Sequence, residues 1–342
     1  MIVTFPYKIL VDVNVKNKIT DFILDLNIGK KGAIICGGRV KDLIAGEIIE
    51  ILSDTFDIKL IDQPDTIEEN ALKDFSSQLK DRDFLIGIGG GRTIDITKYS
   101  AYSIGKPWIA FPTILSHDGV VSSRASLSSN GIKISLIAKE PYAIVTDLEV
   151  IRKAPYRWLA AGAGDILSNI VSVEDWKIAD RAGKEKYNAV IGELAMLPVR
   201  AIQLHIDEIK SKTYHGLEIL LWSLISSGFA MNIYGSSRPC SGSEHNFSHA
   251  LDAHHAGALH GEQCALGAII MSYLQGKDWR NLRDMFKRVG LPTNSKEIGI
   301  SEEILVKALV MARNIRDRYT ILNEVEIDEE KARSILKEVE II

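Results

Sequence analysis

Phe84-Leu-Ile-Gly-Ile-Gly-Gly-Gly-Arg-Thr-Ile-Asp-Ile-Thr-Lys98 is the stretch that decides the fold. The apolar run at 84–88 predicts a strand, and it meets three glycines where a helix is expected to begin. Backbone N–H groups at such a helix start can hold a pyrophosphate, because glycines let the phosphate oxygens approach the main chain. Three glycines also occur in tight turns that bind nothing, so this segment alone leaves both interpretations open.

Short β-rich runs alternate with helical stretches on both sides of this segment. Strands are predicted at 32–36, 56–61, 84–88 and 108–111, with helices at 40–53 and 66–79. From 127 to 147 the pattern changes, because 131–138 alternates and 142–146 follows a turn at Pro141. We therefore expect residues 1–150 to form an α/β, Rossmann-like dinucleotide-binding domain that ends in a β excursion.

After about residue 150 the sequence follows helical periodicity. Helices are predicted at 155–181, 186–210, 215–233, 243–256 and 260–275, followed by three shorter ones. We expect residues 151–342 to be an all-helical domain that binds metal and substrate, packed against the first domain with a cleft between them. The segment 217–234 is long and apolar, but polar residues interrupt it, so a buried core helix is expected and not a membrane span.

Composition narrows the possible partners and the compartment. The 342 residues are 46% hydrophobic and 25% charged, with a net charge of −4, so nucleic acid is not expected as a partner. Cys36, Cys240 and Cys264 are widely spaced and odd in number, which argues against a disulfide framework and for a reducing, cytoplasmic compartment. Residues 1–8 lack the features of a signal peptide.

Five of the eight histidines fall within sixteen residues, between positions 245 and 260. His245 and His249 are one helical turn apart and share a face, and either could join His260 and the upstream Asp165 at a zinc ion with an open fourth position. A polar helix face without a ligand role is the alternative. The zinc-protease pattern fails because Asn246 stands where a glutamate is needed.

Other residues near the histidines and the strands are weaker candidates for a functional role. His254 and His255 are expected to be loop or supporting residues, since sequence neighbours point to different sides of a helix. Cys264 follows His260 by four residues and could face the same metal, although a small buried apolar role is preferred. Gly37-Gly38 offers a second approach for a nucleotide, and Asp62 is a candidate ribose acceptor or an exposed loop residue.

The polar stretch 113–123 directly follows the strand predicted at 108–111. It should lie at the carboxyl edge of the sheet, where ligands collect in open α/β folds. Its hydroxyl groups are candidate cofactor contacts, and Asp118 is a candidate partner for a substrate hydroxyl. A surface loop rich in turn-forming residues is the alternative.

Together, Gly-Gly-Gly-x-x-x-Asp-x-x-Lys at 89–98, Asp165, the histidine pair and His260-Gly-Glu262 resemble one superfamily. It comprises iron- or zinc-containing alcohol dehydrogenases, glycerol dehydrogenase and dehydroquinate synthase. The stretches 111–123 and 242–249 most resemble the glycerol-1-phosphate dehydrogenases within it. The resemblance covers nearly the whole chain and implies the dehydroquinate synthase-like fold.

The resemblance also implies roles for individual residues. The implied metal ligands are Asp165, His245 and His260, whereas His249 would assist the substrate as a hydrogen-bond or proton-transfer partner. Substrate contacts would come from Asp118, Asp165 and His249, with Asp118 and His249 as the catalytic pair. Cofactor contacts would come from Gly89, Gly90, Gly91, Arg92, Thr93, Thr113, Ser116 and Ser122. Residues 113–116 read Thr-Ile-Leu-Ser where related proteins often have Thr-Ser-x-Ser, a departure within the cofactor loop.

The implied activity is reversible reduction of dihydroxyacetone phosphate by NADH or NADPH to sn-glycerol 1-phosphate, the backbone of archaeal phospholipids. Zinc is expected as the Lewis acid in preference to iron. Arg238 and Arg124 are candidate phosphate contacts, and a homo-oligomer is expected. A polyol dehydrogenase, a dehydroquinate-synthase-like lyase and a non-catalytic nucleotide-binding protein remain the alternatives.

Overall fold

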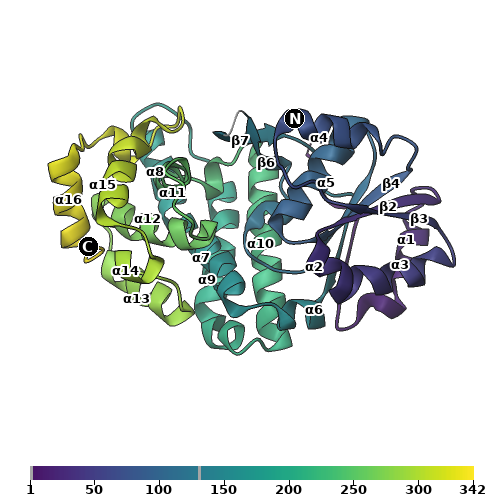
Figure 1. Cartoon of the computed structure of the whole chain (residues 1–342). Helices are drawn as coiled ribbons and strands as arrows, with labels where there is room; N and C mark the ends of the chain where they lie inside the picture. Colours follow the sequence, from purple (N-terminus) through teal and green to yellow (C-terminus); the bar gives the residue numbers. More distant parts are fainter. Residues whose placement is uncertain (1–2, 130–131) are drawn as a thin grey trace. The chain divides into compact units, whose positions relative to one another are not determined.

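The computed structural model describes residues 3–129 and 132–342. The chain folds into two compact units (Figure 1). The α/β unit extends to Leu115 and includes Gly119–Ala154, and the helical unit comprises Ser116–Asp118 and Pro155–Ile342. The short segment Ser116–Asp118 therefore belongs with the helices, although the chain on both sides of it belongs to the α/β unit.

A six-stranded parallel sheet forms the centre of the α/β unit, in the order β1-β8-β5-β4-β2-β3. Its strands are β1 (Lys8–Asp12), β2 (Lys31–Cys36), β3 (Asp57–Asp62), β4 (Phe84–Gly89), β5 (Trp108–Pro112) and β8 (Ala143–Asp147). The predicted α/β architecture and the four predicted strands at 32–36, 56–61, 84–88 and 108–111 are confirmed.

One expectation about the strands was wrong. Residues 142–146 do not belong to the β excursion, because β8 lies between β1 and β5 in the main sheet. All five residues of β8 are buried, as expected for an inner parallel strand. The excursion itself is an antiparallel hairpin of β6 (Arg124–Ser129) and β7 (Ile132–Ile137), and Gly131, which the prediction included, lies outside the described residues. The strand β1 was not predicted.

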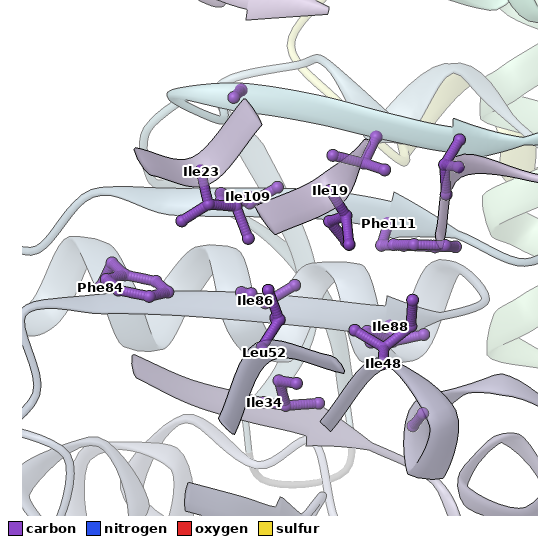
Figure 2. Close-up of a cluster of buried hydrophobic side chains, with 14 of the residues drawn as sticks. Ile19, Ile23, Ile34, Ile48, Leu52, Phe84, Ile86, Ile88, Ile109 and Phe111 are labelled. Atoms are coloured by element: carbon purple, nitrogen blue, oxygen red, sulfur yellow. The ribbon is translucent and has the colours of Figure 1, made fainter. Parts of the chain in front are cut away.

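The two faces of β4 explain why its sequence alternates between large residues and glycine. Ile86 and Ile88 join a buried cluster with side chains of α1 (Ile19–Asp25) and α3 (Gly46–Ser53), as Figure 2 shows. On the other face, a Cβ at Gly87 would lie 2.6 Å from Thr97 Oγ1, and one at Gly89 would lie 2.3 Å from Thr93 Oγ1. The glycines therefore let α5 (Gly91–Ile104) rest directly on the strand.

The other helices of this unit differ from the predicted ranges at their ends. The helix expected at 40–53 consists of α2 (Gly38–Val40), a π-helical turn at Lys41–Ala45 and α3. The helix expected at 66–79 is the shorter α4 (Glu69–Ser77), and α6 (Leu148–Lys153) follows β8. In Figure 1, α4 and α5 lie on the opposite side of the sheet from α1 and α3, which gives the unit its three layers.

Asp95 and Lys98 of the glycine-rich motif fasten the segment that leads into β6. Lys98 is completely buried, and its Nζ donates to the carbonyl oxygens of Gly119 and Arg124, both at 2.6 Å. It also lies 3.1 Å from Asp95 Oδ1, while Asp95 Oδ2 accepts a hydrogen bond from the Ser126 N–H at 3.2 Å. This motif therefore has a structural role beyond its glycines.

We expect Lys98→Met to lower the free energy of unfolding by about 3–5 kcal/mol, because it leaves a buried carboxylate and two carbonyls without their donor. Urea denaturation of the variant measures this loss. Lys73→Met is the matched control, since Lys73 pairs with Glu69 at the surface and such a pair contributes about 1 kcal/mol or less. Equal losses in the two variants would contradict the role of Lys98.

The helical unit contains the predicted long helices with changed boundaries. They are α7 (Tyr156–Leu167), α8 (Asn169–Arg181), α9 (Ala189–Lys210), α10 (Tyr214–Tyr234), α11 (Ser243–Ala253) and α12 (His260–Leu274). The expected single helix at 155–181 is divided at Ser168, whose hydroxyl donates to the Asp165 carbonyl oxygen at 2.7 Å. Where three terminal helices were expected there are α13 (Trp279–Val289), α14 (Ser295–Ile298), α15 (Glu302–Met311) and α16 (Glu329–Glu338).

Two helices of this unit, α9 and α10, are long and apolar enough to cross a membrane by length and composition alone. Core helices of water-soluble proteins pass the same test. The most apolar part of α10 is 56% buried and that of α9 is 39% buried, and the two helices pack against each other. The expectation of a core helix at 217–234 agrees with the burial of α10.

Candidate active site

Close packing of three helices builds the candidate metal centre. A Cβ at Gly261 on α12 would lie 1.8 Å from the Ala161 carbonyl oxygen on α7, and one at Gly164 would lie 2.7 Å from the Gly261 carbonyl oxygen. Gly267 makes a similar approach to α11, 2.8 Å from the Glu244 carbonyl oxygen. Without side chains at these points, the backbones of α7, α11 and α12 come near enough for short side chains to meet.

Asp165, His245, His260 and Cys264 each contribute one possible ligand atom, and these atoms all lie within 4.8 Å of one another. Asp165 Oδ1 lies 3.5 Å from His245 Nε2 and 3.6 Å from His260 Nε2. Nitrogen, oxygen and sulfur donors at this spacing suit zinc and iron. The structure thus brings together the three residues named from the sequence as metal ligands, and adds Cys264.

Cys264 differs from the preferred sequence interpretation in one respect. It is fully buried, as a small apolar residue would be, but its Sγ lies 3.5 Å from His260 Nε2. Burial raises the pKa of its thiol, which favours the neutral form over the thiolate that binds metals. The Cys264 thiol is therefore a weaker candidate ligand than the Asp165 carboxylate and the imidazoles of His245 and His260. All three cysteines are free.

The charge of Asp165 favours a cation in this cluster. Burial raises the pKa of Asp165, but the hydrogen bond with His245 and the charges of His260 and His245 lower it by more, to about 2. Asp165 is therefore an ionised carboxylate at neutral pH, although only 2% of its surface is exposed. A buried negative charge of this kind is best compensated by a positive ion or by protonated imidazoles.

Hydrogen bonds around the cluster orient both imidazoles. Glu244 Oε1 lies 2.7 Å from His245 Nδ1 and, as a carboxylate, accepts its proton. The Ser248 hydroxyl donates to Gln263 Oε1 at 2.7 Å, so it must accept from His260 Nδ1 at 3.1 Å. In each histidine Nδ1 is thereby occupied and Nε2 faces Asp165, so a metal ion that takes the place of any proton there would bind the Nε2 lone pair.

We expect Glu244→Gln to weaken metal affinity by about 10–100-fold, because the carboxylate that orients His245 and raises its basicity is lost. Competition with a chromogenic chelator measures the affinity. Glu262→Gln is the matched control, since Glu262 is also buried but pairs with Arg157 and not with a histidine of the cluster. Equal weakening in both variants would contradict the role of Glu244. Glu244 was not predicted from the sequence, although its place directly before His245 was a usable signal.

The two residues assigned to catalysis lie beside this cluster in the helical unit. The His249 ring centroid is 6.5 Å from that of His245 and 6.1 Å from that of His260, so His249 borders the ligand group without belonging to it. The Asp118 N–H donates to Asp165 Oδ2 at 3.0 Å, and its carboxylate accepts from the Ser227 hydroxyl at 2.8 Å. His254 and His255 lie just beyond α11.

The residues assigned to the cofactor gather at the carboxyl ends of the strands in the α/β unit. Gly89 ends β4, Gly90 precedes α5, and the Thr113 N–H after β5 donates to the Gly89 carbonyl oxygen at 3.0 Å. Gly37 follows β2, and Asp62 ends the paired strand β3. These groups lie at one edge of the sheet, next to the point between β2 and β4 where the strand order reverses.

Three of the remaining cofactor candidates, Arg92, Thr93 and Ser122, have side-chain partners in this structure. The Thr93 hydroxyl donates to Gln63 Oε1 at 2.6 Å, and the Arg92 guanidinium donates to the Pro64 carbonyl oxygen at 3.1 Å. Ser122 belongs to the α/β unit and donates to the Arg124 carbonyl oxygen at 3.3 Å, whereas Ser116 belongs to the helical unit. Gln63, which was not predicted from the sequence, extends the set of polar groups at this edge.

The two arginines suggested as phosphate contacts are not supported. Arg238 is completely buried and pairs with Glu185 at 3.3 Å, so a substrate phosphate cannot reach it in this structure. The Arg124 guanidinium donates to the hydroxyl and carbonyl oxygens of Ser135 across the β6–β7 hairpin. Both predictions rested on residue type alone, which does not reveal internal partners.

Known proteins resemble this chain over most of its length. The model of the iron-containing alcohol dehydrogenase family matches residues 10–155. The chain is 39% identical over 340 residues to the glycerol-1-phosphate dehydrogenase (NAD(P)+) of Pyrococcus horikoshii, covering 97% of each protein. It is also 39% identical over 327 residues to that of Methanosarcina mazei, covering 93% of this chain and 90% of the relative.

Solved structures share the fold at lower identity. Glycerol dehydrogenase from Schizosaccharomyces pombe matches with a TM-score of 0.83 and 22% identity, covering 99% of this chain and 90% of that one. A probable glycerol dehydrogenase from Sinorhizobium meliloti matches with a TM-score of 0.81 and 20% identity, covering 99% and 97%. The resemblance inferred from the motifs is confirmed, and the chain belongs to the glycerol-1-phosphate dehydrogenases of the iron-containing alcohol dehydrogenase family.

Proposed function

We propose that the chain catalyses the NAD(P)-dependent, reversible reduction of dihydroxyacetone phosphate to sn-glycerol 1-phosphate, the backbone of archaeal phospholipids. Relatives that match this chain over nearly their whole length are named glycerol-1-phosphate dehydrogenase. Their names favour this activity over the polyol dehydrogenase and the lyase. The α/β unit would bind the cofactor, and the helical unit would bind metal and substrate.

The observation that carries this proposal is the convergence of Asp165, His245 and His260, whose ligand atoms lie within 4.8 Å of one another. One carboxylate and two imidazoles are a donor set for catalytic zinc, with iron as the second choice. A cation held by these three residues would polarise the substrate carbonyl and stabilise the charge that develops on its oxygen.

The neighbouring side chains would position the substrate and supply its proton. Asp118 is held by Ser227 and by its own N–H bond to Asp165, and its carboxylate would accept a hydrogen bond from a substrate hydroxyl. The imidazole of His249 is the candidate donor of the proton that the product hydroxyl requires. Neither residue would bind the metal, and both would be needed for turnover.

The cofactor would be held along the carboxyl edge of the sheet. The N–H groups at Gly90, Gly91 and Arg92, at the start of α5, would hold the pyrophosphate, and it is the cofactor that supplies the hydride. Thr93, Thr113, Ser116 and Ser122 would add hydroxyl contacts. We further propose a homo-oligomer in the cytoplasm; the three free cysteines support the reducing compartment.

A comparison of substrates tests the function directly. We expect kcat/KM for oxidation of sn-glycerol 1-phosphate to exceed that for glycerol by at least about 10²-fold, because a site that binds a phosphate loses that binding energy with glycerol. The absorbance of NADH or NADPH follows both reactions. Equal rates would favour a polyol dehydrogenase, and turnover without net NADH would favour the lyase.

A further inference from the structure

A second group of metal-binding side chains lies where α9 meets α10 in the helical unit. His205, Glu208 and His215 each offer one ligand atom, and these atoms lie within 4.8 Å of one another. Glu208 Oε1 lies 2.8 Å from His205 Nδ1, and Glu208 Oε2 lies 2.7 Å from His215 Nδ1. We propose that these three side chains bind a second divalent cation, of the borderline class that includes Zn²⁺.

The chemistry of the three side chains suits such an ion. Two imidazoles and a carboxylate form a donor set that zinc accepts, with water completing the coordination. The side chains of His205, Glu208 and His215 are 29%, 41% and 57% exposed, so an ion reaches them from solvent without any movement of the fold. Hard cations such as Mg²⁺ prefer oxygen donors and would compete poorly here.

The positions of the hydrogens on the two imidazoles are compatible with binding of a metal ion. Glu208 is a carboxylate and only accepts hydrogen bonds, from His205 at 2.8 Å and from His215 at 2.7 Å. Each Nδ1 therefore carries the hydrogen in the metal-free arrangement. An ion would take the place of these two hydrogens and bind the Nδ1 lone pairs, with the hydrogen of each imidazole on Nε2.

The main chain holds this group in place before any ion binds. The Glu208 carbonyl oxygen accepts from the N–H of Thr213 at 3.1 Å and from its hydroxyl at 3.4 Å. Gly216 packs on the same residue, since a Cβ there would lie 2.4 Å from the Glu208 carbonyl carbon. The backbone of His205 is non-helical inside α9 (φ −118°, ψ 22°). Together with the contact at Gly216, this backbone geometry places the three side chains on the same side of the α9–α10 connection. The main chain at this site therefore loses little conformational freedom on binding.

A cation here would fasten the start of α10 to the end of α9. The helix α10 carries Ser227, whose hydroxyl donates to the Asp118 carboxylate. The site would therefore stabilise a helix that supports the candidate active site, while leaving the catalytic ligands untouched. An ion that binds only the folded chain stabilises it by RT ln(1 + c/Kd), where c is the free ion concentration, so the melting temperature rises with c.

Zinc counting on the full-length, tag-free protein tests the proposal, with equilibrium dialysis at micromolar free Zn²⁺ followed by elemental analysis. We expect one ion fewer per chain in His215→Ala than in wild type. In the His245→Ala background, where the catalytic site is impaired, we expect one ion to remain, and His215→Ala in that background should remove it. Asp207→Asn is the control, because Asp207 is an exposed acid of the same turn that pairs with Arg288.

The outcomes separate this inference from the catalytic proposal, on which it does not depend. Unchanged zinc content in His215→Ala, or a His245→Ala protein that binds no zinc, would overturn the second site. A wild type that binds one ion, lost in His215→Ala but kept in His245→Ala, would uphold the second site and reject the catalytic ligands. Zinc should also raise the melting temperature of His245→Ala but not of the double variant.

Discussion

Replacing His245 with alanine is expected to remove the catalytic metal and to lower kcat/KM by about 10³-fold or more, since Lewis-acid stabilisation is worth several kcal/mol. The expected loss is large because His245 is 8% exposed and its imidazole is oriented by Glu244, so a preorganised ligand is removed. Metal analysis and the dehydrogenase assay on the same sample measure both effects. Asp165→Ala and His260→Ala should behave in the same way.

His249→Ala is the matched control, because it removes an imidazole one helical turn away on the same helix. We expect this variant to keep its metal and to lose turnover, since His249 lies outside the ligand group. If His249→Ala is the metal-free protein and His245→Ala is not, the ligand assignment is wrong by one turn of α11.

Local patterns in the sequence were sufficient to predict most of the α/β unit. The strands β2, β4 and β5 are apolar runs bounded by glycine or proline, and such runs are typical of buried strands. For β8 the pattern was equally clear, but its place in the sheet was not. Strand order depends on contacts between distant residues, and β8 pairs with β1, more than a hundred residues away in sequence.

In the candidate site, too, some residues could be identified from local sequence and others depended on tertiary contacts. Asp165, His245 and His260 could be named because their residue types and spacing point to a metal ion. Ser248 could not be placed, because its contact with His260 depends on how α11 packs against α12. Cys264 was only a weaker candidate, although it lies on the same helix as His260 and four residues after it. The burial of Arg238 could not be foreseen for a related reason, since its internal partner Glu185 lies on a segment far from it in sequence.

The second large effect concerns the spacing of the helices that carry the ligands. We expect Gly261→Ala to lose the metal and to lower the free energy of unfolding by about 3 kcal/mol or more. The new Cβ would lie 1.8 Å from the Ala161 carbonyl oxygen, a main-chain atom that cannot rotate away, so α12 must move from α7. That movement separates His260, next to Gly261, from Asp165 on α7.

Gly257→Ala is the control for this prediction, because a Cβ at Gly257 meets nothing within 4 Å. It should keep wild-type metal content and stability, as measured by elemental analysis and urea denaturation. Gly261→Ala retains every proposed ligand, so metal loss in that variant would show that the distance between α7 and α12 determines binding as much as the donors do. A Gly261→Ala protein with full metal occupancy would mean instead that Asp165 and His260 need not lie on closely packed helices to share an ion.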